Sequence, residues 1–429
     1  MCRKRQAQLL AELALVAALA GASFVVLRGA ALRQPFSVDE SRWIATSRYF
    51  WITFVDGDLF GPEWAPNYVV LTHPPVARYV IGLGLWLQGW HPDDLNGRYD
   101  ADRSRRYNVQ AGNIPSRSLL DAARRVMFAF ALGAVLLLYV VGRSLGGPVA
   151  GATAVLLALA CPLLTALWTR ALAESILVFF TLLGFVLATR VVAARQKGAD
   201  RERWSVGLGL AVGLATATKL SGALLAAGLA VYALARTGLE SWQARRLRGP
   251  GPWIDAGLAA ILTFVLVNPL LYPNPLVRTT LLFEHRLDEM EQQAQGTPRL
   301  AIPPDLRVRA ARMAQRTFYE YGAVRALTGL PLDGLLAALG VVIAGTGSWR
   351  AARKKAAPGP EAMLLCWAAV TFVVSTAALG FDSSHYVMLP ETVAILLEAV
   401  AVSWLAGSGW RAVLRTGALS RGRRSGTAA

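Results

Sequence analysis

Residues 204–235 read WSVGLGLAVGLATATKLSGALLAAGLAVYALA, an apolar stretch that contains a single charge, Lys219. A membrane-spanning helix needs about 20 apolar residues, so this stretch is too long for one helix and suits two short ones. It lies between two basic connectors, 190–203 and 236–248. Short basic loops stay on the cytoplasmic side of a membrane, so an even number of crossings must separate these two. We therefore predict a hairpin of two helices with Lys219 near its outer tip.

Apolar blocks recur along the whole chain of 429 residues, of which 55% are hydrophobic and only 17% charged. The mean hydropathy of +0.42 is too high for an ordinary soluble enzyme. This composition also excludes a disordered chain and a small disulfide scaffold, and it indicates a multi-pass membrane protein. The net charge of +17 does not indicate nucleic acid, because the basic residues punctuate apolar blocks as membrane loops do. The three cysteines have no metal-ligand spacing.

The remaining apolar blocks complete the predicted topology; by residue number they are about 7–27, 121–142, 148–168, 172–189, 254–271, 332–348, 361–379 and 386–407. With the hairpin they predict an all-α polytopic fold of about ten transmembrane helices, both ends cytoplasmic. We expect one transmembrane domain over 1–409, outer loops at about 28–120 and 272–331, and a basic, disordered cytoplasmic tail over 410–429. Residues 76–90 are roughly 22 Å long as a helix, against a hydrocarbon core of roughly 30 Å, so we expect them to lie in the interface.

The first outer loop carries the residues that indicate chemistry. It opens with the acidic pair Asp39-Glu40, and an aromatic-rich run over 43–54 follows, whose apolar side as a helix suits the level of lipid headgroups. Then comes His73-Pro74-Pro75, with Arg78 one turn into the helix that the prolines start. Singly, each has an ordinary interpretation: the acid caps a helix, the histidine marks a turn and the arginine reaches headgroups.

Together these residues resemble the membrane glycosyltransferases that use polyprenyl-phosphate sugars, namely the protein O-mannosyltransferases and the lipid A aminoarabinose transferases of the C-type (GT-C) fold. In those families an Asp-Glu pair follows the first helix, and a His-Pro-Pro or Lys-Pro-Pro motif comes later in the same loop. Weaker likenesses continue down the chain at Arg124 or Arg125, Arg170, Glu174, Lys219, His385 and Tyr386. Glu174 stands where the families have Asp, and His385 where they often have Arg.

The resemblance implies an integral-membrane glycosyltransferase of the plasma (inner) membrane. It would move a sugar from a polyprenyl-phosphate donor to a hydroxyl of a protein, lipid or glycan on the extracytoplasmic side. A carboxylate takes the acceptor's proton and cations meet the departing phosphate. We assign Asp39 as the catalytic base and Glu40 as its catalytic partner. The expected donor-phosphate ligands are His73, Arg78, Arg125 and Lys219, and the expected supporting residues are Arg170, Glu174, His385 and Tyr386.

Several alternatives stay open. Lys219 reaching the outer headgroups, and a plain ion pair between Arg170 and Glu174, explain those residues without catalysis. A polytopic transporter or lipid flippase without glycosyl transfer is the alternative function. The expected partners are the donor, the acceptor and membrane lipids, with no nucleic acid. We expect no cofactor and no metal ligands; a divalent metal held by His285 and the acidic pair is the minor alternative.

Overall fold

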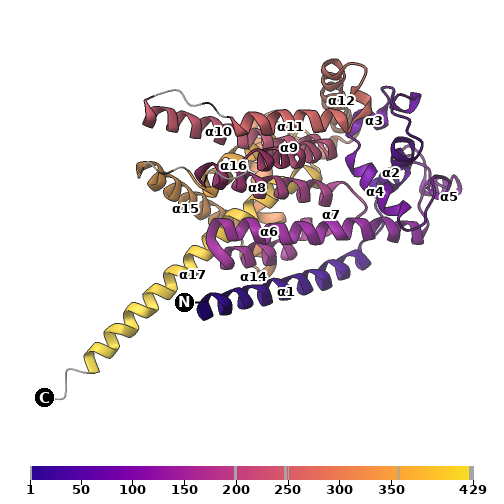
Figure 1. Cartoon of the computed structure of the whole chain (residues 1–429). Helices are drawn as coiled ribbons and strands as arrows, with labels where there is room; N and C mark the ends of the chain where they lie inside the picture. Colours follow the sequence, from indigo (N-terminus) through magenta and orange to yellow (C-terminus); the bar gives the residue numbers. More distant parts are fainter. Residues whose placement is uncertain are drawn as a thin grey trace.

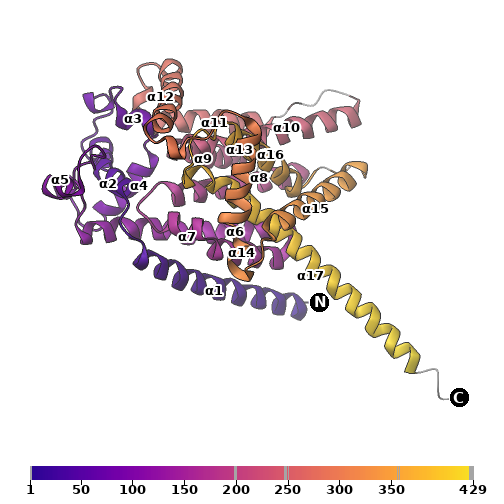
Figure 2. The same ribbon diagram turned by 180° about the vertical axis from the view of Figure 1, so that it is seen from behind.

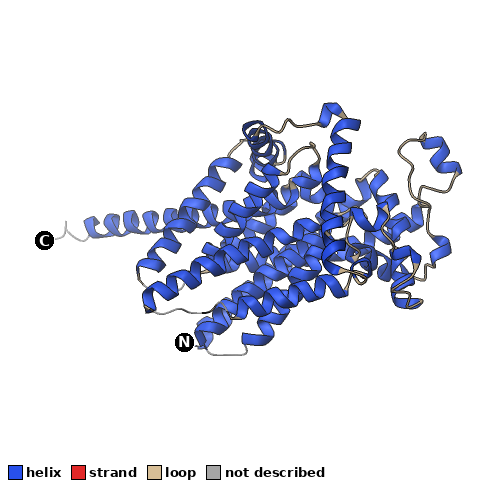
Figure 3. Ribbon diagram, turned by 90° about the horizontal axis from the view of Figure 1, so that it is seen from above, coloured by secondary structure: helices blue, strands red, loops and turns tan. Residues whose placement is uncertain are grey.

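The computed structural model describes residues 2–424 apart from 198–200, 246–248, 250, 355 and 357. Its long helices run side by side, and the short helices α2 to α5 gather at one end of them (Figure 1). The start of α1 and the end of α17 lie toward the opposite end, as an even number of crossings requires. All the described regular elements are helical (Figure 3), apart from an isolated bridge between Ala301 and Phe381. The predicted all-α membrane fold is confirmed.

The longer helices are α1 (Cys2–Arg33), α6 (Arg117–Ala160), α8 (Glu174–Lys197), α9 (Arg201–Thr218), α10 (Ala223–Ala244), α11 (Pro252–Leu266), α12 (Pro275–Gly296), α15 (Asp333–Arg353), α16 (Pro360–Ala377) and α17 (Met388–Arg424). The shorter ones are α2 (Val38–Thr46), α3 (Tyr68–Thr72), α4 (Val76–Trp86), α5 (Arg105–Gln110), α7 (Pro162–Trp168), α13 (Leu306–Gln315) and α14 (Ala323–Thr328). Short helical turns are η1 (Trp51–Val55), η2 (Pro62–Trp64), η3 (Pro92–Asp94), η4 (Leu220–Gly222), η5 (Pro269–Leu271), η6 (Pro298–Leu300), η7 (Arg316–Glu320) and η8 (Ser384–Tyr386).

The hairpin predicted over 204–235 is present. Helix α9 ends at Thr218, Lys219 adopts an extended conformation with φ −150° and ψ 142°, and α10 follows after η4. The turn is so tight that a Cβ atom on Gly222 would lie 2.3 Å from the carbonyl carbon of Ala215, so only glycine fits there. The turn therefore fixes Lys219 at the tip of the hairpin.

Helix α6 contains a second hairpin, because its 44 residues are interrupted at Gly146 and Gly147, with Pro148 directly after them. The two halves pack closely: a Cβ atom on Gly151 would lie 2.7 Å from the carbonyl oxygen of Tyr139. The halves correspond to the separately predicted blocks 121–142 and 148–168. Seven helices of the described chain, with α6 counted once, are long and apolar enough to cross a membrane, so the total of ten crossings stays a prediction.

The aromatic run of the first outer loop packs inside the protein, so the expectation that its apolar side faces lipid headgroups is wrong for most of the run. Trp43, Phe50 and Trp51 are at most 7% exposed, whereas Phe54 is 61% exposed. Periodicity showed that one side of the run is apolar but not which partner covers it. Helix α4 has 11 residues, too short to cross a membrane as predicted, and it packs on α6 and α2.

The second outer loop divides into two parts. Helix α12 lies beside α3 at the end of the bundle that carries the first loop (Figure 1). Helices α13 and α14, with η7 between them, run across the long helices and contact α16 and α6 (Figure 2). The two parts of the segment 272–331 thus lie against different parts of the bundle, and its place on the outer side of the membrane stays a prediction. In the basic tail, α17 continues to Arg424 and the last five residues lie outside the described part, so its expected disorder stays a prediction.

Candidate active site

A cavity of about 1330 Å³ opens between the bundle and the short helices of the outer loops. Seven of the ten residues assigned from the sequence line it: Asp39, His73, Arg78, Glu174, Lys219, His385 and Tyr386. The other three, Glu40, Arg125 and Arg170, do not contribute to its wall. The cavity is therefore the place where the sequence motifs converge.

The acidic pair has two different environments. Both residues lie in the first turn of α2, where Ser37 caps the helix and its backbone N–H donates to Glu40 Oε2 at 2.9 Å. The side chain of Asp39 lines the cavity and is 42% exposed. Glu40 is fully buried and turns away into the protein. Only Asp39 is thus in position to meet a bound molecule.

Glu40 binds Arg124, the first of the two candidate arginines at the start of the second span. The Arg124 Nε and Nη2 atoms each donate to a Glu40 oxygen at 2.7 Å, and the backbone N–H of Ala171 donates to Oε1 at 2.9 Å. Arg125 is exposed and donates to Gln88 instead. The arginine assigned to the donor phosphate is therefore directed away from the cavity, and its neighbour holds the acidic pair. Two adjacent residues of a helix point about 100° apart, so the sequence alone did not fix which one faces inward.

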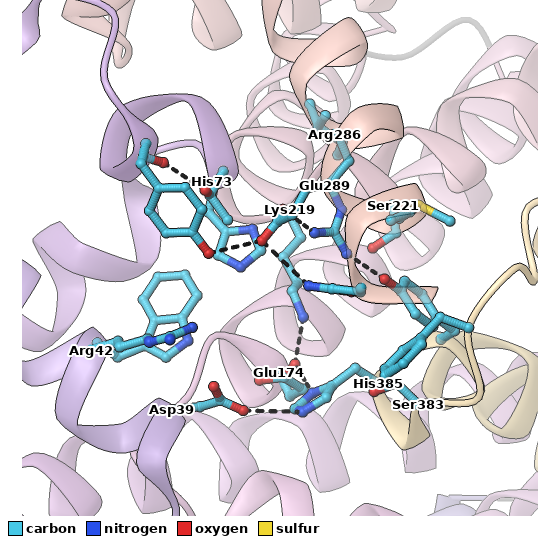
Figure 4. Close-up of a pocket in the computed structure, with 18 of the residues that line it drawn as sticks. Asp39, Arg42, His73, Glu174, Lys219, Ser221, Arg286, Glu289, Ser383 and His385 are labelled. Atoms are coloured by element: carbon cyan, nitrogen blue, oxygen red, sulfur yellow. Dashed lines mark hydrogen bonds and ion pairs between the residues drawn. The ribbon is translucent and has the colours of Figure 1, made fainter. Parts of the chain in front are cut away.

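Four ionisable side chains form a continuous row across the cavity wall, and we call them the charged row: Lys219, Glu174, His385 and Asp39 (Figure 4). The Lys219 ammonium donates to Glu174 Oε1 at 2.6 Å, and His385 Nδ1 lies 2.7 Å from the same oxygen. On the other side of the ring, His385 Nε2 lies 3.7 Å from Asp39 Oδ2. The row brings together residues from the hairpin tip, α8, η8 and α2.

Arg78 is the second cation on the cavity wall. It is 3% exposed, lies over the rings of Trp43 and Tyr49, and donates from Nη2 to the carbonyl of Val69. Its Nε and Nη1 atoms have no partner among the described residues. Burial lowers the pKa of Arg78 to about 10, which still leaves a cation at neutral pH. A buried guanidinium with two free donors is a strong anion ligand.

His73 stacks on Trp43, with ring centroids 5.1 Å apart. Burial lowers the pKa of His73 well below its usual range, and the charges of Lys219, Arg286 and Arg78 lower it further. The imidazole is therefore neutral at neutral pH, and it offers an N–H group rather than a charge.

Helix α12 adds cavity residues that the sequence analysis did not assign. Arg286 donates to Tyr386 Oη at 2.5 Å and pairs with Glu289, which accepts from Tyr68 Oη at 3.0 Å. Their signal in the sequence is that they are an oppositely charged pair three residues apart, a spacing that places both on one side of a helix. The tyrosine partners lie far away in sequence, so the spacing of residues could not predict these contacts.

Two further expectations concern single residues. Glu174 pairs with Lys219 and His385, and no ion pair joins it to Arg170 among the described residues. His285 lies 3.5 Å from Thr72 Oγ1 and faces α3, away from the acidic pair. In the described part of the chain, no group of three or more His, Cys, Asp and Glu side chains is arranged to hold a metal ion.

Apolar side chains from η4, α10, α12, α16 and α17 also line the cavity. These residues are Leu220, Ala223, Leu224, Ala227, Phe283, Leu287, Met290, Val374, Ala378 and Leu389. The cavity thus combines the charged row with apolar side chains from several helices. Such a lining suits a ligand with an ionic head and a hydrocarbon tail.

Comparison with known proteins supports the fold. The sequence model of the family described as dolichyl-phosphate-mannose-protein mannosyltransferase matches residues 117–270. No curated protein matches the chain in sequence. Two solved structures share its fold: ArnT from Cupriavidus metallidurans bound to undecaprenyl phosphate, and the oligosaccharyltransferase AglB from Archaeoglobus fulgidus in complex with an inhibitory peptide and a dolichol-phosphate.

The match to ArnT has a TM-score of 0.55 and 20% identity, and it covers 96% of this chain and 63% of that one. The match to AglB has a TM-score of 0.56 and 13% identity, and it covers 94% of this chain and 52% of that one. This chain therefore spans less than two thirds of the length of either relative. Over nearly its whole described length it has the GT-C fold of membrane glycosyltransferases, as its motifs predicted.

Proposed function

We propose that this protein is an integral-membrane glycosyltransferase that moves a sugar from a polyprenyl-phosphate donor to an acceptor hydroxyl on the outer side of the membrane. One observation carries the proposal: a single cavity is lined both by a carboxylate and cations and by apolar side chains from several helices. The donor has matching parts, an anionic phosphate and a long hydrocarbon tail. The solved relatives that share the fold hold undecaprenyl phosphate or dolichol-phosphate.

The reaction needs a base on the acceptor side, and Asp39 is the exposed carboxylate of the pair. It takes the proton of the acceptor hydroxyl while the hydroxyl oxygen forms a bond to the anomeric carbon of the sugar. The bond from that carbon to the phosphate oxygen breaks, and its electron pair leaves with the polyprenyl phosphate. Glu40 has a structural role: its carboxylate binds Ser37, Arg124 and Ala171, and these contacts hold the helix that carries Asp39.

The departing phosphate gains negative charge, and two cations of the cavity wall can stabilise that charge. Lys219 stands at the hairpin tip, directly before Leu220 of the apolar lining, and its side chain is 17% exposed. Arg78 offers two unpartnered donors from the cavity wall. Charge that develops in the transition state is stabilised most by fixed donors in a site that excludes water. His73, neutral and beside them, supplies a hydrogen-bond donor. We propose no metal step.

The acceptor enters from the side of the first outer loop, where Arg98, Asp100 and Asp102 line the cavity. The acceptor class is a protein, lipid or glycan hydroxyl, and the membrane is the plasma (inner) membrane. Neither the fold nor the comparisons support the alternative of a transporter or flippase without glycosyl transfer.

The test uses the purified protein in nanodiscs with two labelled donors, polyprenyl-phosphate mannose and polyprenyl-phosphate aminoarabinose, and a membrane extract as the acceptor source. Asp39→Asn keeps the shape of the side chain and removes the proton acceptor, so transfer should fall about 10²–10⁴-fold. Binding of undecaprenyl phosphate should stay close to that of the wild type. The matched control is Asp121→Asn, an exposed aspartate of α6 paired with Arg117, which should transfer normally. Wild-type turnover in Asp39→Asn would contradict the proposal.

A second arm tests the phosphate site. Lys219→Ala should weaken binding of undecaprenyl phosphate about 10- to 150-fold, because a hydrogen bond to a charged group contributes roughly 1.5–3 kcal/mol. Unchanged binding would remove Lys219 from the phosphate site.

A further inference from the structure

The imidazole of His385 lies between two carboxylates. Its Nδ1 atom is 2.7 Å from Glu174 Oε1, and its Nε2 atom is 3.7 Å from Asp39 Oδ2 (Figure 4). Glu174 is 1% exposed and comes from α8, whereas Asp39 comes from α2. The ring therefore connects a carboxylate fixed inside the bundle to a carboxylate on the first outer loop.

Two acceptors on one ring favour a particular protonation state. A neutral imidazole has one N–H group and one lone pair, so it satisfies only one of the two carboxylates. The imidazolium donates from both nitrogens and can satisfy both carboxylates. The positions of the two carboxylates therefore fit the protonated ring better than the neutral one.

Asp39 has little else to hold its side chain. Among the described residues, its one ion pair is the contact with His385, and no side-chain hydrogen bond of Asp39 is formed. Glu40 fixes the backbone of the same turn, but it leaves the neighbouring carboxylate free to rotate. The direction of Asp39 into the cavity thus depends on His385.

We propose that His385, as an imidazolium held by Glu174, is the positioning residue that directs the Asp39 carboxylate toward the acceptor hydroxyl. The inference rests on the proposed function, in which Asp39 is the base. Glu174 in turn is kept in place by Lys219, whose ammonium shares the same oxygen. The charged row then has two ends with different tasks: Lys219 faces the phosphate and Asp39 faces the acceptor.

The opposite role, with His385 itself as the proton acceptor, requires a neutral ring with a free lone pair on Nε2. That lone pair would face the Asp39 oxygen at 3.7 Å, an arrangement of two acceptors without a proton between them. The geometry therefore favours the cationic role. A test must separate the two, and it must allow for the other charged groups on the elements around the ring: Arg42 on α2, Lys219, Arg286 on α12, and Asp382 on the segment before η8.

The first experiment compares turnover and donor binding in His385 variants of the full chain. His385→Gln keeps a hydrogen-bonding group but no charge, so turnover should fall about 10²-fold, the cost of a misdirected catalytic group. Binding of undecaprenyl phosphate should not change. His385→Arg carries a planar cation that pairs with two carboxylates and should restore most of the lost turnover. His91→Gln, which changes an exposed histidine of the first loop, is the matched control.

The second experiment is the pH profile of turnover, which a purely structural role would not alter. An imidazolium can lose its proton on the alkaline side of the profile, whereas a guanidinium cannot, so the comparison is between the alkaline limbs of wild type and His385→Arg. His385→Arg stays charged, so an alkaline fall caused by His385 should disappear in this variant. This readout needs only the arginine variant and is therefore independent of whether His385→Gln folds.

Three outcomes would overturn the proposal: full turnover in His385→Gln, an alkaline fall that is the same in wild type and His385→Arg, or a His385→Arg variant that binds undecaprenyl phosphate but is as inactive as His385→Gln. In each of these cases the wild type still transfers sugar. If the proposed function itself fails, the wild type shows no transfer with either donor.

Discussion

The two outer loops are held over the same cavity by different means. The first loop is anchored by the buried ion pair of Glu40 with Arg124, a residue at the start of α6, at 0% and 7% side-chain exposure. The second loop reaches the cavity through α12, where Arg286 contacts Tyr386 and Glu289 contacts Tyr68; 22% of the Arg286 side chain and 8% of the Glu289 side chain are exposed. The first loop is thus fixed to the bundle by a fully buried pair, and α12 is attached to both the bundle and the first loop through a less buried one.

The difference in anchoring matches two different requirements of the site. A base must keep its position, because an error of about 1 Å in a catalytic group costs about 10²-fold in rate. A wall over the cavity must let a lipid-linked donor and an acceptor enter and leave. Breaking a buried ion pair is far more costly than breaking an exposed one. The loop that carries Asp39 has the buried anchor, and α12 has the weaker contacts.

The largest effect should come from removing the anchor of the first loop. Arg124→Ala leaves the Glu40 carboxylate buried without its cation, which should cost about 3–5 kcal/mol and abolish transfer. Arg125→Ala is the matched control, since it removes the same side chain one residue later at an exposed position. Thermal unfolding in nanodiscs and transfer of labelled sugar measure both effects. Equal stability of the two variants would show that the buried pair is not an anchor.

A smaller effect should follow from loosening α12. Arg286→Ala removes the contacts with Glu289 and Tyr386, each a hydrogen bond with a charged partner that contributes about 1.5–3 kcal/mol. We expect faster amide hydrogen exchange in α12 and weaker binding of undecaprenyl phosphate, with the first loop still protected. Arg299→Ala, at an exposed position beyond α12, serves as control. Increased exchange in α2 as well would mean that the two loops do not move independently.

The smallest effect should come from an ion pair on the surface of the same helix that carries Arg124. Arg117 and Asp121 are 75% and 42% exposed, and such pairs contribute about 0–1 kcal/mol. Arg117→Ala should therefore change neither transfer nor unfolding measurably. A loss comparable to that of Arg124→Ala would remove the distinction between buried and exposed anchors.

The sequence predicted the helices better than their contacts. The length of 204–235 and the charges on both sides of it fix the hairpin and the place of Lys219, because these depend only on membrane thickness and loop charge. The rotation of a helix is not contained in such a pattern. Arg124 and Arg125 therefore could not be told apart, and the pattern could not show that Lys219 and His385 are the partners of Glu174. In the row across the cavity, His385 contacts Glu174, 211 positions away, and Asp39, which is further away still.

The Glu40 network also has a consequence for biosynthesis. Besides the nearby N–H of Ser37, the groups that hold this carboxylate are Arg124 and the N–H of Ala171, which lie 84 and 131 residues further along the chain. A polypeptide is made from its N-terminus, so the first loop leaves the ribosome long before these two partners exist. Its acid has no cationic partner until Arg124 has been made, and its set of partners is complete only with Ala171. An arrest of translation before Ala171 should therefore leave the first loop open to proteases, and release just after it should close the loop.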